Sequence, residues 1–115
     1  MSAFAFGSEF TVGMEEELLL VDRATLQLAP VAGDVLEAMH VDPEEAGHEA
    51  YAAQIELRSP PSESASDAAV ALAELRRLAR DAGATLMASG LHPTGRSGDA
   101  LGETWVVQRH DIGAA

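Results

Sequence analysis

Three consecutive glutamates interrupt an otherwise apolar stretch at residues 10–22, which reads FTVGMEEELLLVD. The stretch is typical of a β-strand, in which successive side chains point to opposite faces, so Glu15 and Glu17 share one face. Two like charges on a half-buried face are costly. A hard divalent cation such as Mg²⁺ or Mn²⁺ relieves that cost because it prefers carboxylate oxygens. The alternative is a solvent-facing strand with an acidic edge, and these residues alone favour the two interpretations equally.

The charge balance narrows the classes of partner. The 115 residues carry 19 acidic against 7 basic side chains, a formal net charge of −12. This disfavours a nucleic-acid backbone or an anionic membrane as partner, and it is compatible with cation binding. The chain has no cysteine, which excludes disulfides and thiolate metal sites. The length corresponds to one domain or a piece of one.

The N-terminus and the apolar runs indicate in which cellular compartment the protein is expected. No apolar run reaches the length of a membrane span, and the start lacks the basic and apolar regions of a signal peptide. A cytoplasmic protein is therefore expected. Residues 7–10 read GSEF, which a cloning junction commonly encodes, so residues 1–10 are expected to be disordered or tag-like. A native disordered terminus is the alternative.

Periodicity and turn residues predict six elements in an α+β fold. They are strands at 10–21, 26–31, 50–58 and 84–89, the second pairing back on the first as a hairpin, and helices at 33–39 and 64–82. We expect a mostly antiparallel sheet of about four strands packed on one long and one short helix. Asp34 and either Ser64 or Ser66 are the expected N-caps. Residues 41–48 are expected to form a polar loop. The expected buried positions are Val12, Leu18, Leu20, Ile55, Leu57, Leu72, Leu75, Leu86 and Trp105.

Two groups of polar residues have competing interpretations. Arg76, Arg77 and Arg80 lie in the last turns of the long helix, where cations complement the helix dipole. We prefer this interpretation, with a solvated face, to a phosphate site. His40 and His48 flank the polar loop, and solvated loop histidines are far more common than metal ligands.

A second acidic strand carries Glu56 and Arg58 on one face, with Glu49 seven residues before Glu56. Carboxylates from separate strands that face one space are a common way to build a Mg²⁺ site for ATP chemistry. Arg58 beside them is suited to a phosphate or a substrate carboxylate. The alternative for Arg58 is an interstrand salt bridge to a glutamate, which requires no function.

Three segments, TVGMEEELLLVD, QIELRSPP and MASGLHPTG, together resemble the N-terminal part of the glutamate–cysteine ligase type 2 family. These are carboxylate–amine ligases related to glutamine synthetase. The segments come in the family's order with similar separations. The resemblance covers residues 11–100 and leaves residues 101–115 as a short tail. It implies a partial glutamine synthetase-like catalytic fold.

The resemblance implies ATP-dependent chemistry with Mg²⁺ or Mn²⁺. By position in the motifs, Glu15, Glu17 and Glu56 match the family's metal-binding glutamates, and Glu49 matches by spacing alone. Arg58 is the candidate catalytic residue. His92 also falls in a family motif, without an assigned role.

Family catalytic domains are much longer than this chain. A truncated member is therefore expected, inactive alone and dependent on a second copy or a completing chain for ATP and amino-acid binding. The alternative is a non-catalytic domain that keeps only the fold and self-associates or binds a partner.

Overall fold

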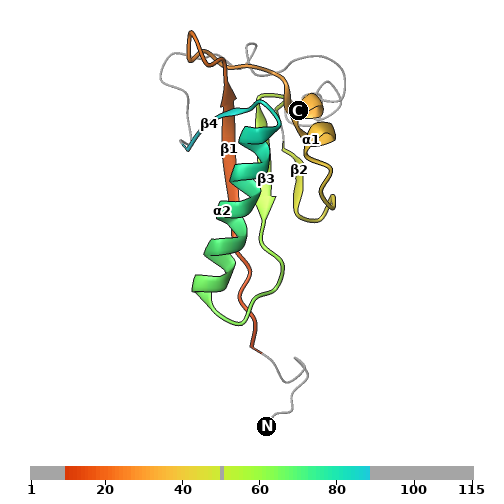
Figure 1. Ribbon diagram of the computed structural model, residues 1–115, viewed down its shortest axis with the longest axis vertical. Coiled ribbons are helices and arrows are strands. Elements are labelled where there is room, and N and C mark those ends of the chain that lie inside the picture. Colours follow the sequence, from red (N-terminus) through yellow and green to blue (C-terminus); the bar gives the residue numbers. More distant parts are fainter. Residues whose placement is uncertain (1–9, 50, 89–115) are drawn as a thin grey trace, which may run out of the picture.

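The computed structural model describes residues 10–49 and 51–88 (Figure 1). These residues form an α+β fold with one four-stranded antiparallel sheet, one long helix and one short helix, as the sequence predicts. The elements are β1 (Glu15–Val21), α1 (Ala32–Met39), β2 (Ala46–His48), β3 (Gln54–Arg58), α2 (Ala65–Asp81) and β4 (Thr85–Met87). The strand order is β2-β3-β1-β4, so β1 and β3 form the centre of the sheet.

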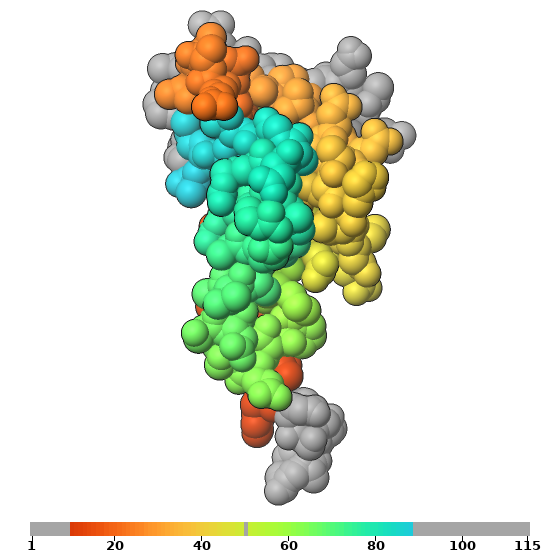
Figure 2. All heavy atoms as spheres, viewed as in Figure 1, coloured from red at the N-terminus to blue at the C-terminus, as the bar shows by residue number. Residues whose placement is uncertain are grey.

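One face of the sheet is the core. Alternation along β1 and β3 directs Leu18, Leu20, Ile55 and Leu57 to this face, where each is at most 2 % exposed. The long helix α2 runs along the sheet, and its side chains cover this face (Figures 1 and 2). Burying each of these large aliphatic side chains contributes about 1.5–3 kcal/mol to stability. The opposite face of β1 and β3 carries polar side chains at Glu15, Glu17, Glu56 and Arg58, and buried apolar ones at Leu19 and Val21.

The sequence predicts α2 closely. Ser64 is the N-cap in an extended conformation, and its hydroxyl accepts the backbone N–H of Asp67 at 3.0 Å. The buried residues of the helix recur at helical spacing: Ala68, Leu72, Leu75 and Ala79. The helix ends before Gly83, whose φ of 100° is accessible to glycine at little cost.

The predicted hairpin strand at 26–31 is wrong. Only an isolated bridge between Val21 and Leu28 joins this segment to β1. Leu26 has a φ of 61°, which breaks an extended backbone, and Pro30 has no N–H to donate to a ladder. The turn before it is held by Asp22, whose carboxylate accepts the backbone N–H groups of Ala24 and Thr25 at 2.8 and 2.9 Å.

The predicted polar loop at 41–48 is wrong at its end, because residues 46–48 form β2 on the edge of β3. The pairing begins where Arg58 donates its backbone N–H to the Glu45 carbonyl at 2.8 Å. The predicted strand at 50–58 begins only at Gln54. The short helix α1 begins at Ala32, and Asp34 lies in its first turn instead of at the N-cap.

Most of the predicted core is confirmed. Val12 and Leu86 are only half-buried: Val12 lies in an isolated bridge before β1, and Leu86 lies on the edge strand β4. Trp105, His92, residues 1–9 and the predicted tail at 101–115 lie outside the described residues. Within the described ranges, neither helix has the length and apolar character that crossing a membrane requires.

Candidate metal centre

The polar face of the sheet carries acidic side chains from both central strands. In the antiparallel register of β1 and β3, Glu17 lies directly opposite Glu56 and Glu15 lies opposite Arg58. All four side chains share the face that points away from α2, because the residues between them, Glu16 and Leu57, occupy the core face. The placement that the sequence predicts for these four residues on one face agrees with this register.

Three carboxylates converge on this face. One oxygen from each of Glu17, Glu49 and Glu56 lies within 4.8 Å of the other two. Two oxygens bound to Mg²⁺ at about 2.1 Å lie no more than about 4.2 Å apart, so small side-chain movements bring all three into contact with one ion. An all-oxygen donor set fits Mg²⁺ or Mn²⁺. We call Glu17, Glu49 and Glu56 the carboxylate cluster.

Arg58 orients one member of the cluster. Its Nε and Nη2 donate to the same oxygen of Glu56, Oε1, at 3.0 and 2.7 Å. Its Nη1 donates to the backbone carbonyls of Pro43 and Glu44 at 3.2 and 3.1 Å. The side chain thus ties β3 to the segment before β2. The salt bridge considered from the sequence is present, but it joins two residues of one strand, not two strands.

Glu15 lies outside the carboxylate cluster. It lines a hollow of about 480 Å³ together with Arg58 and Glu44, beside the cluster. Ser59 closes one side of this hollow, and its hydroxyl accepts the backbone N–H of Met14 at 2.9 Å. The structure therefore brings Glu17 and Glu56 together in the carboxylate cluster and places Glu15 with Arg58 at a neighbouring hollow.

The third glutamate of the run faces the other way. The carboxylate of Glu16 lies on the core face and forms an ion pair with Arg76 of α2, at 2.6 Å between Oε1 and Nη1. One run of three glutamates therefore serves both faces of the sheet. The alternation of β1 separates Glu16 from the cluster.

Two contributions to the site escape the sequence interpretation. Gly47 of β2 packs against Arg58, and a Cβ at this position would lie 3.3 Å from Nη2. Such a contact is tighter than ordinary van der Waals packing, so glycine leaves room for the guanidinium. The carbonyls of Pro43 and Glu44 are backbone groups with no sequence signal.

Comparison with known proteins identifies a family. The family model described as "Glutamate-cysteine ligase family 2 (GCS2)" matches residues 11–111. A protein of Rubrobacter xylanophilus named "Putative glutamate--cysteine ligase 2-3" is 38% identical over 96 residues, which cover 78% of this chain and 26% of the relative. A second protein of that organism, named "Putative glutamate--cysteine ligase 2-1", is 32% identical over 97 residues, with 80% and 26% covered.

The matched region spans about a quarter of the length of these curated relatives. No solved structure matches the chain, so the expected likeness to the glutamine synthetase catalytic fold stays a prediction. The family model covers most of the chain, including all the residues of the candidate site. The chain belongs to glutamate–cysteine ligase family 2.

Proposed function

We propose that this chain supplies the metal-binding part of an ATP-dependent carboxylate–amine ligase that joins an amine to the γ-carboxylate of glutamate. The observation that carries the proposal is the convergence of Glu17, Glu49 and Glu56 within 4.8 Å on one face of the sheet. Two of these residues lie in the segments that resemble the ligase family. A bound divalent cation supplies charge neutralisation for the phosphates of ATP.

The two central strands fix the cluster in place. Glu17 and Glu56 are direct cross-strand partners, so the backbone sets the separation of their side-chain origins. Glu56 is further restrained, because Arg58 holds its Oε1 by two hydrogen bonds. A carboxylate that a charged partner holds by one oxygen loses little conformational entropy when its other oxygen binds a metal. Residues that hydrogen-bond to metal ligands usually have this orienting role.

Arg58 also reaches the hollow that contains Glu15. We assign this hollow to the anionic end of a substrate, because a guanidinium is well matched to a carboxylate or phosphate. Its hydrogen bonds to Pro43 and Glu44 hold the guanidinium at the boundary between hollow and cluster. In this role Arg58 contacts the substrate on one side and orients Glu56 on the other.

Elements beyond the described residues are proposed to complete the site. Phosphoryl transfer depends mainly on positioning the nucleotide and the acceptor in line. The matched region is 26% of each relative's length. The remaining contacts to ATP and both amino acids are assigned to a completing chain or a second copy, which pairs with an edge strand of the sheet.

Calorimetric titration tests this function. Mn²⁺ is titrated into the protein with and without ATP, for wild type, Glu56→Gln and the control Glu74→Gln on the exposed surface of α2. We expect Mn²⁺ to bind wild type and Glu74→Gln, and ATP to bind them only with the metal. Glu56→Gln is expected to lose both signals. ATP binding that is equal without metal, or equal in Glu56→Gln, would contradict the proposal.

A further inference from the structure

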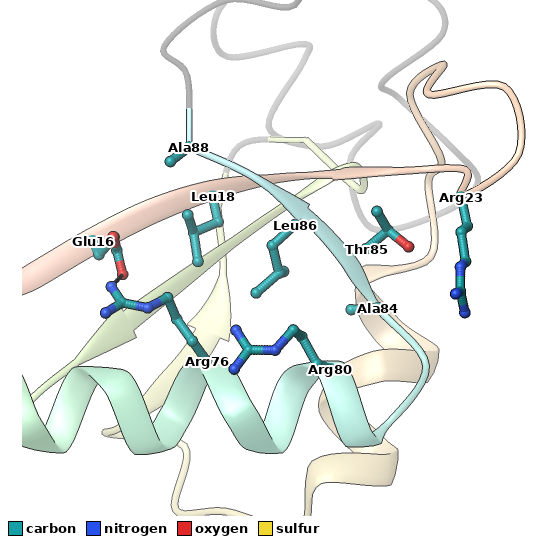
Figure 3. Close-up of a pocket in the computed structure, with 9 residues that line it drawn as sticks. All are labelled: Glu16, Leu18, Arg23, Arg76, Arg80, Ala84, Thr85, Leu86 and Ala88. Carbon is teal, nitrogen blue, oxygen red and sulfur yellow. Dashed lines mark hydrogen bonds and ion pairs between the residues drawn. The ribbon is translucent and has the colours of Figure 1, made fainter.

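A second hollow lies on the other side of the sheet from the carboxylate cluster. It has a volume of about 570 Å³ and opens between β1, β4 and the C-terminal half of α2 (Figure 3). Its walls include apolar side chains, among them Leu18 and Leu86. Volumes of about 300–1,000 Å³ are typical of small-molecule sites. We call it the arginine hollow.

Three arginines line the arginine hollow: Arg23 from the turn after β1, and Arg76 and Arg80 from α2. The chain has seven basic residues and a net charge of −12, so three of its seven cations gather at one place. Glu16 is the acidic residue in the lining, and it is paired with Arg76 (Figure 3). Among the described lining residues, three guanidiniums against one carboxylate leave two positive charges in excess.

Arg23 and Arg80 carry that excess. Among residues 10–49 and 51–88, no hydrogen bond or ion pair engages either side chain. A smaller hollow of about 300 Å³ adjoins the first, and both arginines line it as well. Asp22 also lines the smaller hollow, but its carboxylate accepts hydrogen bonds from Ala24 and Thr25. These bonds lower the pKa of Asp22, and they all fall on its Oδ1.

Arg77, on the same helix, is an arginine whose charge is neutralised by acidic neighbours. It forms ion pairs with Glu74 and Asp81, one turn away on either side. Its hydrogen bond to Glu74 raises the pKa of Arg77 and keeps it charged, with both partners exposed. The interpretation of the arginine run as a solvated face therefore describes Arg77. Arg80 differs because it faces a hollow and has no acidic partner on its own helix.

We propose that the arginine hollow binds a small phosphorylated molecule. Arg80 binds the phosphate, since a guanidinium presents parallel N–H donors that match two phosphate oxygens, and Arg23 adds positive charge from the other end of the hollow (Figure 3). Leu86, which is half-buried, contacts the apolar part of the ligand. The hollow is larger than a phosphate ion, which favours a phosphate monoester with an apolar group. The site is on the core face of the sheet, so it is independent of the carboxylate cluster and of the proposed ligase function.

The test is calorimetric titration of the whole chain with phenyl phosphate, in chelator and at constant ionic strength. The chelator removes any contribution from the carboxylate cluster. Inorganic phosphate and succinate are titrated in parallel. We expect phenyl phosphate to bind more tightly than inorganic phosphate, and succinate to bind more weakly than either. Loss of the charge-assisted contact in Arg80→Gln is expected to weaken binding about tenfold or more, and loss of the more distant charge in Arg23→Gln is expected to weaken it less.

Two variants serve as controls. Arg77→Gln removes the same charge from the same helix, and Glu56→Gln alters the carboxylate cluster, so both are expected to bind phenyl phosphate like wild type. Circular dichroism confirms that each variant is folded. Three results would overturn the proposal: no binding to wild type, equal weakening in Arg77→Gln and Arg80→Gln, or succinate binding as tightly as phenyl phosphate. Weakening in Glu56→Gln would assign the ligand to the other face and also overturn it.

Discussion

Arg58 donates two hydrogen bonds to a single oxygen of Glu56, so one residue of β3 orients another two positions away on the same face. The same guanidinium reaches two backbone carbonyls before β2. The edge strand β2 and the candidate metal ligand Glu56 are therefore held by one side chain. A change at Arg58 is expected to affect the cluster and the packing of β2 together.

Arg58→Gln is predicted to weaken Mn²⁺ binding about 10- to 100-fold, the usual effect of losing a partner behind a metal ligand. Calorimetric titration measures the dissociation constant. Arg77→Gln, which removes an exposed guanidinium on α2, is the matched control and is expected to leave the affinity unchanged. An unchanged affinity in Arg58→Gln would show that Glu56 needs no such support.

Gly47→Ala is predicted to reproduce part of the Arg58 effect. The added Cβ would lie 3.3 Å from Nη2, so the guanidinium must shift away from Glu56. We expect a loss of stability of about 1 kcal/mol, at the low end for overpacking, and a smaller loss of Mn²⁺ affinity than in Arg58→Gln. Urea unfolding and calorimetry measure the two quantities.

The control for Gly47→Ala is Gly33→Ala in α1, where the nearest atom to the new Cβ is His48 Cε1 at 4.0 Å. Alanine is favoured over glycine in a helix by up to about 1 kcal/mol, so this variant is expected to be more stable than wild type. If Gly47→Ala is stabilised in the same way, the contact with Arg58 does not limit the size of residue 47.

Asp22 is predicted to make stability depend on pH in the acid range. Hydrogen bonds from the backbone N–H groups of Thr25 and Ala24 lower the pKa of Asp22 from its ordinary value of 3.8. The folded chain therefore binds the proton less readily than the unfolded chain. The contribution is fully present above pH 3.8 and is lost as the pH falls through the lower folded pKa.

Urea unfolding of wild type and Asp22→Ala at several pH values measures this dependence. Wild type is expected to be the more stable protein at pH 7, and the difference is expected to shrink below about pH 4. A difference that is constant across this range would mean that the carboxylate contributes nothing to the turn through its charge.

The sequence shows which side chains of one strand share a face, but it does not show which strands pair with each other. Strict alternation is enough to place Glu17 with Glu15 and Glu56 with Arg58, because the members of each pair are two positions apart in a strand, separated by Glu16 and by the buried Leu57. The pairing of β1 with β3 joins strands separated by a turn, a helix and β2, and no local spacing encodes its register. The resemblance to a family supplied that adjacency.

Glu49 and β2 are a second case in which the sequence does not predict the structure. Three residues, AGH, have no apolar alternation, and they become a strand because the free edge of β3 offers hydrogen-bonding groups. The sequence therefore indicated a loop there and gave Glu49 only a match by spacing. Leu26 is a similar case, since a non-glycine residue with positive φ leaves no signal in the sequence.

The melting temperature with millimolar Mg²⁺ and with chelator tests the carboxylate cluster most directly. A ligand that binds only the folded state stabilises it by about 1.4 kcal/mol when its free concentration is ten times the Kd. Wild type, Glu17→Gln, Glu56→Gln, Glu15→Gln and the surface control Glu74→Gln are compared. Glu17 and Glu56 are like charges directly opposite in the sheet, so neutralising Glu17 is expected to raise the melting temperature in chelator, whereas Glu56→Gln also weakens the ion pair with Arg58.

The account predicts that Mg²⁺ raises the melting temperature of wild type, Glu15→Gln and Glu74→Gln, and that Glu17→Gln and Glu56→Gln lose most of the rise. Loss of the rise in Glu15→Gln as well would add Glu15 to the ligands, as the family motif implies. An equal rise in all five proteins, or none in wild type, would contradict a metal site at Glu17, Glu49 and Glu56.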